Sequence, residues 1–107
     1  GQTPTLIFDE VDVGIGGATA HTVGNMLQSL GERAQIICIT HLAQVASKAG
    51  NQLRVSKETL EDSALSQIEV LDKNSRVEEI ARMLGGAEVS KRSRDNAREM
   101  LRLEDEV

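Results

Sequence analysis

Two short apolar runs, at residues 5–9 and 35–40, constrain the fold more than any other feature of the sequence. The first reads Thr-Leu-Ile-Phe-Asp and the second reads Gln-Ile-Ile-Cys-Ile-Thr. Continuous apolar runs of this length are typical of strands buried on both faces, as in a parallel sheet. Between them, a helix is expected from Ala18 to Leu30, with Gly31 as its stop. Strand, helix and strand in this order predict a right-handed parallel crossover and an α/β fold.

Helical periodicity predicts which side of that helix is buried. Four apolar residues recur at the spacing of an amphipathic stripe: Val23, Met26, Leu27 and Leu30. After the second strand, a short helix is expected from Leu42 to Ser47. The alternating segments 52–57 and 66–71 then predict a peripheral antiparallel pair, with a loose polar connection over residues 58–63.

Two helices are expected to close the chain. Ser75 and Glu78 have the spacing of a capping box, which predicts a helix that Gly85 and Gly86 end. A last helix is predicted from Lys91 to Leu103. Its inward residues are expected to be Ala97, Met100 and Leu101.

The first strand has the pattern of a central strand, yet it lies almost at residue 1. Such a strand needs neighbours on both sides and helices on both faces. Two parallel strands and a few helices cannot supply them. We therefore expect residues 1–107 to be a segment of one domain, whose sheet is completed by preceding sequence or by a partner chain.

Composition narrows the function classes. The formal net charge is −5, which disfavours a free-standing nucleic-acid binder, because phosphate contacts need clustered Lys and Arg. The single Cys38 is compatible with a reducing cytoplasm and is expected in the core. With only two histidines besides that cysteine, a structural zinc site is not expected. No apolar run approaches the roughly 20 residues that span a bilayer, and no secretory signal pattern is present.

Adjacent carboxylates, Asp9 and Glu10, follow the first apolar run. Open α/β sheets bind ligands at the carboxyl ends of their strands. Neighbouring side chains on a strand point in different directions, so one carboxylate can hold a magnesium ion while the other faces an attacking water. Phosphoryl transfer needs both roles. In isolation, the pair fits a charged strand end equally well.

Two further features favour the functional interpretation. Gly14, Gly16 and Gly17 follow the carboxylates, and an ordinary strand-to-helix turn rarely needs three glycines. His41 follows the second strand and is expected beside Asp9 and Glu10 if the two strands are neighbours. A neutral imidazole there could donate a hydrogen bond to a γ-phosphate, although a lone histidine at a strand end is more often a surface residue.

Together these residues resemble the second half of an ABC-type nucleotide-binding domain, and in particular the ATPase head of the SMC-like DNA-repair proteins of bacteria. The run Phe-Asp-Glu-Val-Asp-Val-Gly-Ile-Gly-Gly at 8–17 carries most of the resemblance. Further similarity lies at Thr40–Leu42, Gln44–Ala46, Val55–Glu58 and Ile80–Gly86, so it covers nearly the whole chain.

The resemblance implies a role for each residue of the constellation. Asp9 would end the Walker B strand and hold Mg²⁺ through water, and Glu10 would be the catalytic glutamate. His41 would be the switch histidine that senses the γ-phosphate of ATP. The turn after Glu10 would be the D-loop, which lies at the nucleotide and contacts the opposing head through Asp12, Gly14, Gly16 and Gly17. The intact protein would be cytoplasmic and nucleoid-associated, with no membrane partner. It would use ATP and Mg²⁺ to engage two heads in a homodimer, in the recombinational repair of double-strand breaks on DNA.

The sequence departs from the wider family at two points. Most D-loops carry an aspartate where this sequence has Gly16, which puts the usual D-loop contact in doubt. Neither a phosphate-binding loop nor a Leu-Ser-Gly-Gly signature is present. In the family, these motifs and a long coiled coil lie upstream, so the resemblance implies that the upstream half of the head is a partner of this segment, and that the segment alone is inactive.

Two other functions fit parts of the pattern. Asp9-Glu10-Val11-Asp12 resembles the Asp-Glu-x-Asp of superfamily-2 helicases, but Ile39-Thr40-His41 stands where a Ser-Ala-Thr-like motif is expected. A non-catalytic interaction module could keep this fold, although scaffolding requires neither Glu10 nor His41. A basic stripe on the last helix offers a possible DNA contact through Lys91, Arg94, Arg98 and Arg102. Because Asp95 and Glu99 can pair with these arginines, a solvated, internally paired face is favoured.

Overall fold

The computed structural model describes residues 3–11, 13–61, 63–85 and 88–102. The chain begins with the expected crossover of strand β1 (Thr5–Asp9), helix α1 (Gly17–Leu30) and strand β2 (Gln35–Ile39). β1 and β2 pair in parallel, with Leu6 opposite Ile36 and Asp9 opposite Ile39. The α/β fold and the parallel pairing are therefore confirmed.

The parallel pair is covered on one face only. Phe8, Ile36 and Cys38, which share a face by the parallel register, are half-buried. On the opposite face, Ile7 is 68% exposed and Ile39 is 56% exposed. Burial of both faces is therefore wrong for this chain by itself.

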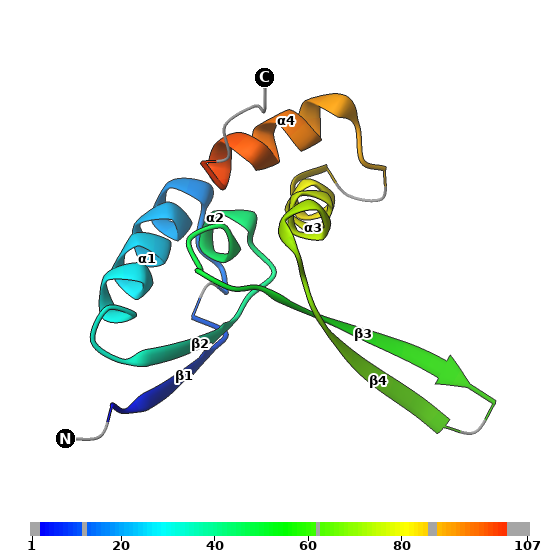
Figure 1. Cartoon of the computed structure of the whole chain (residues 1–107), viewed down its shortest axis with the longest axis horizontal. Helices are drawn as coiled ribbons and strands as arrows, with labels where there is room; N and C mark the ends of the chain where they lie inside the picture. The colour runs from blue at the N-terminus through cyan, green and yellow to red at the C-terminus, as the bar shows by residue number, and fades with distance from the viewer. Residues whose placement is uncertain (1–2, 12, 62, 86–87, 103–107) are drawn as a thin grey trace.

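Helix α1 packs through its small residues. Its buried positions are Ala20 and Gly24, whereas Met26 is 62% exposed and Leu30 is also exposed. The predicted Val23–Leu30 stripe is therefore wrong in part, because the helix meets α2 (Ala43–Ala46) where a small residue allows close approach. Helix α2 lies between α1 and α3 (Lys73–Gly85), as Figure 1 shows.

Strands β3 (Leu53–Leu60) and β4 (Ser63–Val70) form an antiparallel hairpin that projects from the rest of the molecule (Figure 1). The pairing reaches Leu60 and Ser63, so the loose connection predicted over 58–63 is wrong. Every described residue of both strands is exposed. A strand pair without a buried side has no single apolar face by which its length could be predicted.

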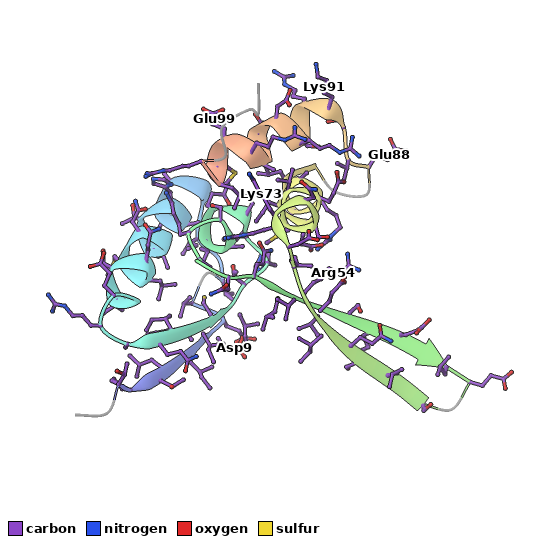
Figure 2. The ribbon with its side chains drawn as sticks, viewed as in Figure 1. Asp9, Arg54, Lys73, Glu88, Lys91 and Glu99 are labelled. Atoms are coloured by element: carbon purple, nitrogen blue, oxygen red, sulfur yellow. The ribbon has the colours of Figure 1, made fainter. Side chains whose placement is uncertain are left out.

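Charged residues fasten the base of the hairpin to α3. The Arg54 guanidinium lies 3.6 Å from a carboxylate oxygen of Glu69 on β4 and 3.6 Å from one of Glu79 on α3. Glu79 is buried and also accepts hydrogen bonds from Arg82, which raise the pKa of that guanidinium. Figure 2 shows Arg54 where the hairpin meets α3.

The core lies between α2, α3 and α4 (Lys91–Met100). Its buried members are small or medium aliphatic residues: Ala43, Ala46, Val77, Ile80, Ala81 and Ala97. Met100 and Leu101 pack against them, as predicted. None of the helices in the described ranges combines the length and the apolar character that crossing a membrane requires.

Both closing helices begin or end differently from the prediction. The Asp72 carboxylate accepts the Ser75 backbone N–H at 2.8 Å, so Asp72 caps α3 in place of the predicted Ser75 box. The predicted stop at Gly85 is confirmed, and Gly86 lies outside the described residues. Helix α4 ends at Met100 because Arg102 adopts a left-handed conformation, with φ of 55°. Leu103 also lies outside the described residues.

Candidate functional site

The carboxyl ends of β1 and β2 bring the predicted site residues to one edge of the parallel pair. Asp9 is the last residue of β1 and lies opposite Ile39, the last residue of β2. Glu10 follows Asp9 directly, and His41 comes two positions after Ile39. Adjacent strands lie about 4.8 Å apart, so the parallel register places these groups at one end of the sheet. All three of these polar residues are exposed, and Figure 2 shows Asp9 at the end of β1.

Glu10 adopts a backbone conformation that sequence inspection did not foresee. Its φ is 60°, which lies in the left-handed region that few non-glycine residues occupy. The backbone N–H of Val13 donates to the Glu10 carbonyl at 3.3 Å, which closes a turn. A turn therefore begins at Glu10, immediately after the strand ends, and Glu10 is exposed there.

Of the three glycines, only Gly14 uses a left-handed backbone, with φ of 76°. Gly16 is extended and forms the N-cap of α1, and Gly17 is the first residue of that helix. A Cβ atom on Gly17 would lie 3.6 Å from the side-chain nitrogen of Gln44, so the side chain of Gln44 in α2 reaches the start of α1. Asp12, the other residue predicted in this turn, lies outside the described residues.

The segment that carries His41 is held by its neighbours. The hydroxyl oxygen of Thr40 accepts the backbone N–H of Leu42 at 3.0 Å, which forms a tight turn around His41. The Leu42 carbonyl then accepts the N–H of Ala46 at 3.0 Å, which starts α2. His41 is therefore joined on one side to β2 and on the other side to a helical turn.

The described residues contain no group of three His, Cys, Asp or Glu side chains that could hold a metal by themselves. A single carboxylate at the strand end is nevertheless compatible with Mg²⁺. This ion keeps several waters and takes one or two carboxylates together with phosphate oxygens. Asp9 fits that requirement, and a closed protein cage is not needed.

Sequence inspection missed one side chain that joins α3 to the end of α2 and to the residues after it. Arg76 of α3 donates to the carbonyls of Ala46 and Ala49 and to the side chain of Gln52. These partners are 24 to 30 residues away along the chain. An arginine in a polar helix position gives no local signal of such contacts.

No protein-family model matches the chain. Curated relatives do. The chain is 48% identical over 100 residues to the DNA repair protein RecN of Vibrio cholerae serotype O1, a match that covers 94% of the chain. It is 51% identical over 98 residues to RecN of Xylella fastidiosa and 42% identical over 100 residues to RecN of Deinococcus radiodurans. The chain spans 18% of the length of each of these relatives.

The fold is similar to that of a solved SMC ATPase. The solved structure belongs to work on the ATP-driven dimerization and DNA-stimulated activation of SMC ATPases. The TM-score is 0.64 at 19% sequence identity, and the match covers 80% of this chain and 51% of the other. The resemblance to SMC-like repair proteins is therefore confirmed, with RecN as the matched protein. The fold is similar to part of that SMC ATPase.

Proposed function

We propose that this chain is the C-terminal part of the ATPase head of a RecN-like, SMC-type DNA-repair protein. The observation that carries the proposal is the meeting of Asp9, Glu10 and His41 at the carboxyl edge of β1 and β2. A metal-holding group, a water-orienting group and a phosphate-sensing group are the parts that ATP hydrolysis needs at such an edge. The sequence similarity to RecN supports the same assignment.

In this proposal, Asp9 holds Mg²⁺ through water. The ion supplies charge neutralisation at the phosphate oxygens when it is bound. Glu10 orients the water that attacks the γ-phosphate, and its left-handed backbone, with φ of 60°, begins a turn directly after Asp9. Both residues are exposed, so their carboxylates are accessible to a triphosphate.

His41 donates a hydrogen bond to the γ-phosphate from the end of the neighbouring strand. The turn that follows Glu10 contacts the opposing head and the nucleotide through Asp12, Gly14, Gly16 and Gly17. Since this sequence contains no phosphate-binding loop or signature motif, the upstream half of the head supplies them. ATP-driven engagement of two heads in a homodimer would then serve repair of double-strand breaks on DNA, in the bacterial cytoplasm and at the nucleoid.

The test compares three variants of the intact protein. Asp9→Asn should weaken Mg-ATP binding and hydrolysis together, because the metal acts in the ground state as well as in the transition state. Glu10→Gln should keep ATP binding, slow hydrolysis by roughly a hundredfold or more, and accumulate engaged dimers. His41→Ala should slow turnover and largely spare binding. The readouts are nucleotide affinity, single-turnover hydrolysis and the dimer fraction with ATP.

Glu32→Gln is the matched control, because this exposed glutamate precedes β2 and so lies toward the amino end of the strands. It should behave as the wild-type protein. A wild-type hydrolysis rate in Glu10→Gln would show that the glutamate assignment is wrong. Failure of that variant to trap a dimer as well would favour a non-catalytic interaction module.

A further inference from the structure

Helix α2 is too short to be stable by itself, yet it fixes the segment that carries His41. It has four residues, Ala43–Ala46, and isolated helices of this length are not stable in water. Three of these residues are buried, and Ala43 and Ala46 belong to the core formed with α3 and α4. Core contacts hold the buried side of α2, and a contact at its C-terminal end further restricts the position of the helix and of His41.

Arg76 of α3 holds that end. Its terminal nitrogen donates to the carbonyl of Ala46 at 3.1 Å and to the carbonyl of Ala49 at 2.5 Å. Its Nε donates to the side-chain oxygen of Gln52 at 3.0 Å. One guanidinium thus binds the last residue of α2 and two residues between α2 and β3, which the planar fork of arginine allows.

The chemistry of these contacts suits a helix end. The last carbonyls of a helix lack partners within the helix, and the C-terminal end of the helix carries partial negative charge. A cation that donates several hydrogen bonds satisfies both. Partial burial lowers the pKa of the Arg76 guanidinium from its usual value, which is the effect of removing a charge from water. Carbonyl oxygens take the place of that water.

We infer that Arg76 is a positioning residue for ATP hydrolysis, acting through α2 on His41. This inference rests on the proposed function. The path is short: Arg76 binds the Ala46 carbonyl, the Ala46 N–H donates to the Leu42 carbonyl, and the Leu42 N–H donates to Thr40 on the other side of His41. Without the guanidinium, α2 keeps its core contacts but loses the anchor at its C-terminal end.

The experiment places Arg76→Gln, His41→Ala and the double variant in the intact protein. Arg76→Gln should lower the single-turnover rate by roughly tenfold, since small displacements of a catalytic group are costly, and should leave ATP affinity unchanged. In the His41→Ala background, Arg76→Gln should cause little further loss, because its effect passes through the missing imidazole. Arg94→Gln is the matched control, because it removes an exposed ion pair between α4 and α3 that does not touch α2.

A wild-type rate in Arg76→Gln, or losses that simply multiply in the double variant, would overturn the inference. If thermal melting shows that Arg76→Gln does not fold, Arg76→Lys decides, because an ammonium keeps the charge but loses the fork. It should show an intermediate loss that disappears in the His41→Ala background, and a wild-type rate would overturn the inference. Glu10→Gln is measured in parallel: an unchanged rate there would remove the proposed function itself, whereas a slow Glu10→Gln with a fast Arg76→Gln would remove this inference alone.

Discussion

Gly24 of α1 lies directly against the backbone of Gln44 in α2. A Cβ atom built on Gly24 would lie 2.8 Å from the Gln44 carbonyl oxygen and 2.9 Å from Cγ of Lys48. Both contacts are shorter than a real Cβ atom tolerates. The lysine side chain can move away, but the Gln44 carbonyl belongs to the backbone of α2. The two helices can keep this separation only while residue 24 has no side chain.

Replacement of Gly24 by alanine should therefore push α1 and α2 apart. Alanine favours a helix over glycine by about 1 kcal/mol, but overpacking against backbone costs about 1–3 kcal/mol. We expect the second effect to win and backbone amides of α2 to exchange faster with solvent. Hydrogen–deuterium exchange of the intact protein measures this.

Gly50→Ala is the control for Gly24→Ala. A Cβ atom on Gly50 would meet nothing within 4 Å. Its exchange pattern should match the wild-type pattern. If Gly24→Ala leaves the protection of α2 unchanged, the close approach of the two helices is not present in solution.

The arginines of α4 should contribute little to DNA affinity. Arg94 donates to Glu78 of α3 at 2.6 Å, which raises the pKa of Arg94, and Arg98 donates to Asp95 at 3.3 Å. Replacement of Arg94, Arg98 and Arg102 by glutamine in the intact protein should leave the dependence of DNA affinity on salt unchanged. Each phosphate contact that is lost would reduce the salt slope by roughly 0.9, so a marked fall would contradict the expectation.

A complementary variant frees these cations instead of removing them. Glu78→Gln combined with Asp95→Asn removes the partners of Arg94 and Arg98 and changes the net charge by two units. If pairing is what keeps the arginines from DNA, this variant should bind DNA more tightly at low salt. Equal binding by both variants and the wild-type protein would show that α4 faces away from DNA altogether.

The start of α3 should depend on the charge of Asp72. The pKa of this carboxyl group lies below its usual value, chiefly because the carboxylate accepts the Ser75 backbone N–H. Because the pKa is lowered in the folded state, the stabilisation is fully present above the usual carboxyl pKa of the unfolded chain. It is lost as the pH falls through the lower pKa of the folded state. Protection of the Ser75 amide from exchange should therefore decrease only in strongly acidic solution.

Asp72→Asn separates charge from hydrogen bonding, because asparagine also caps helices but does not titrate. After correction for intrinsic exchange rates, its Ser75 amide should show no change across that acidic range. Asp72→Ala should expose the same amide at all pH values. A parallel acid response in wild type and Asp72→Asn would assign the effect to another group.

The chain by itself should not hydrolyse ATP. Its sequence lacks the phosphate-binding loop, whose backbone amides and lysine provide most of the contacts to the triphosphate. Phosphate release by the purified chain should equal the buffer blank, with and without Mg²⁺. Release that Glu10→Gln abolishes would contradict this, because a contaminating ATPase would not respond to that substitution.

Hydrophobic pattern predicted the part of the fold that depends on local sequence. The apolar runs that became β1 and β2 are continuous, and parallel pairing then brings Asp9 and His41 to the same edge without further information. The packing of α1 was not predictable in the same way. Periodicity favours large apolar residues such as Met26, whereas the contact with α2 depends on the absence of a side chain at Gly24.

The long-range polar contacts could not be predicted from the pattern of apolar and polar residues in the sequence. Arg76 binds carbonyls up to 30 residues away, and Arg54 bridges a strand and a helix, although neither has a distinctive neighbour in sequence. The left-handed backbone at Glu10 was equally hidden, because glycine is the residue from which that conformation is usually inferred. The roles of Asp9, Glu10, Asp12, the glycines and His41 stay predictions.

Because Glu10 has a positive φ, position 10 has two independent requirements. The residue must tolerate a left-handed backbone, and it must supply a carboxylate for the proposed hydrolysis. A saturation library read out by protein abundance would rank substitutions by backbone tolerance: glycine, asparagine and aspartate above valine and isoleucine, whose branched side chains disfavour this region. The same library read out by hydrolysis would rank them by carboxylate chemistry. Aspartate is the informative substitution, because it alone is compatible with both requirements. Its residual rate would therefore measure what one methylene of reach contributes to catalysis.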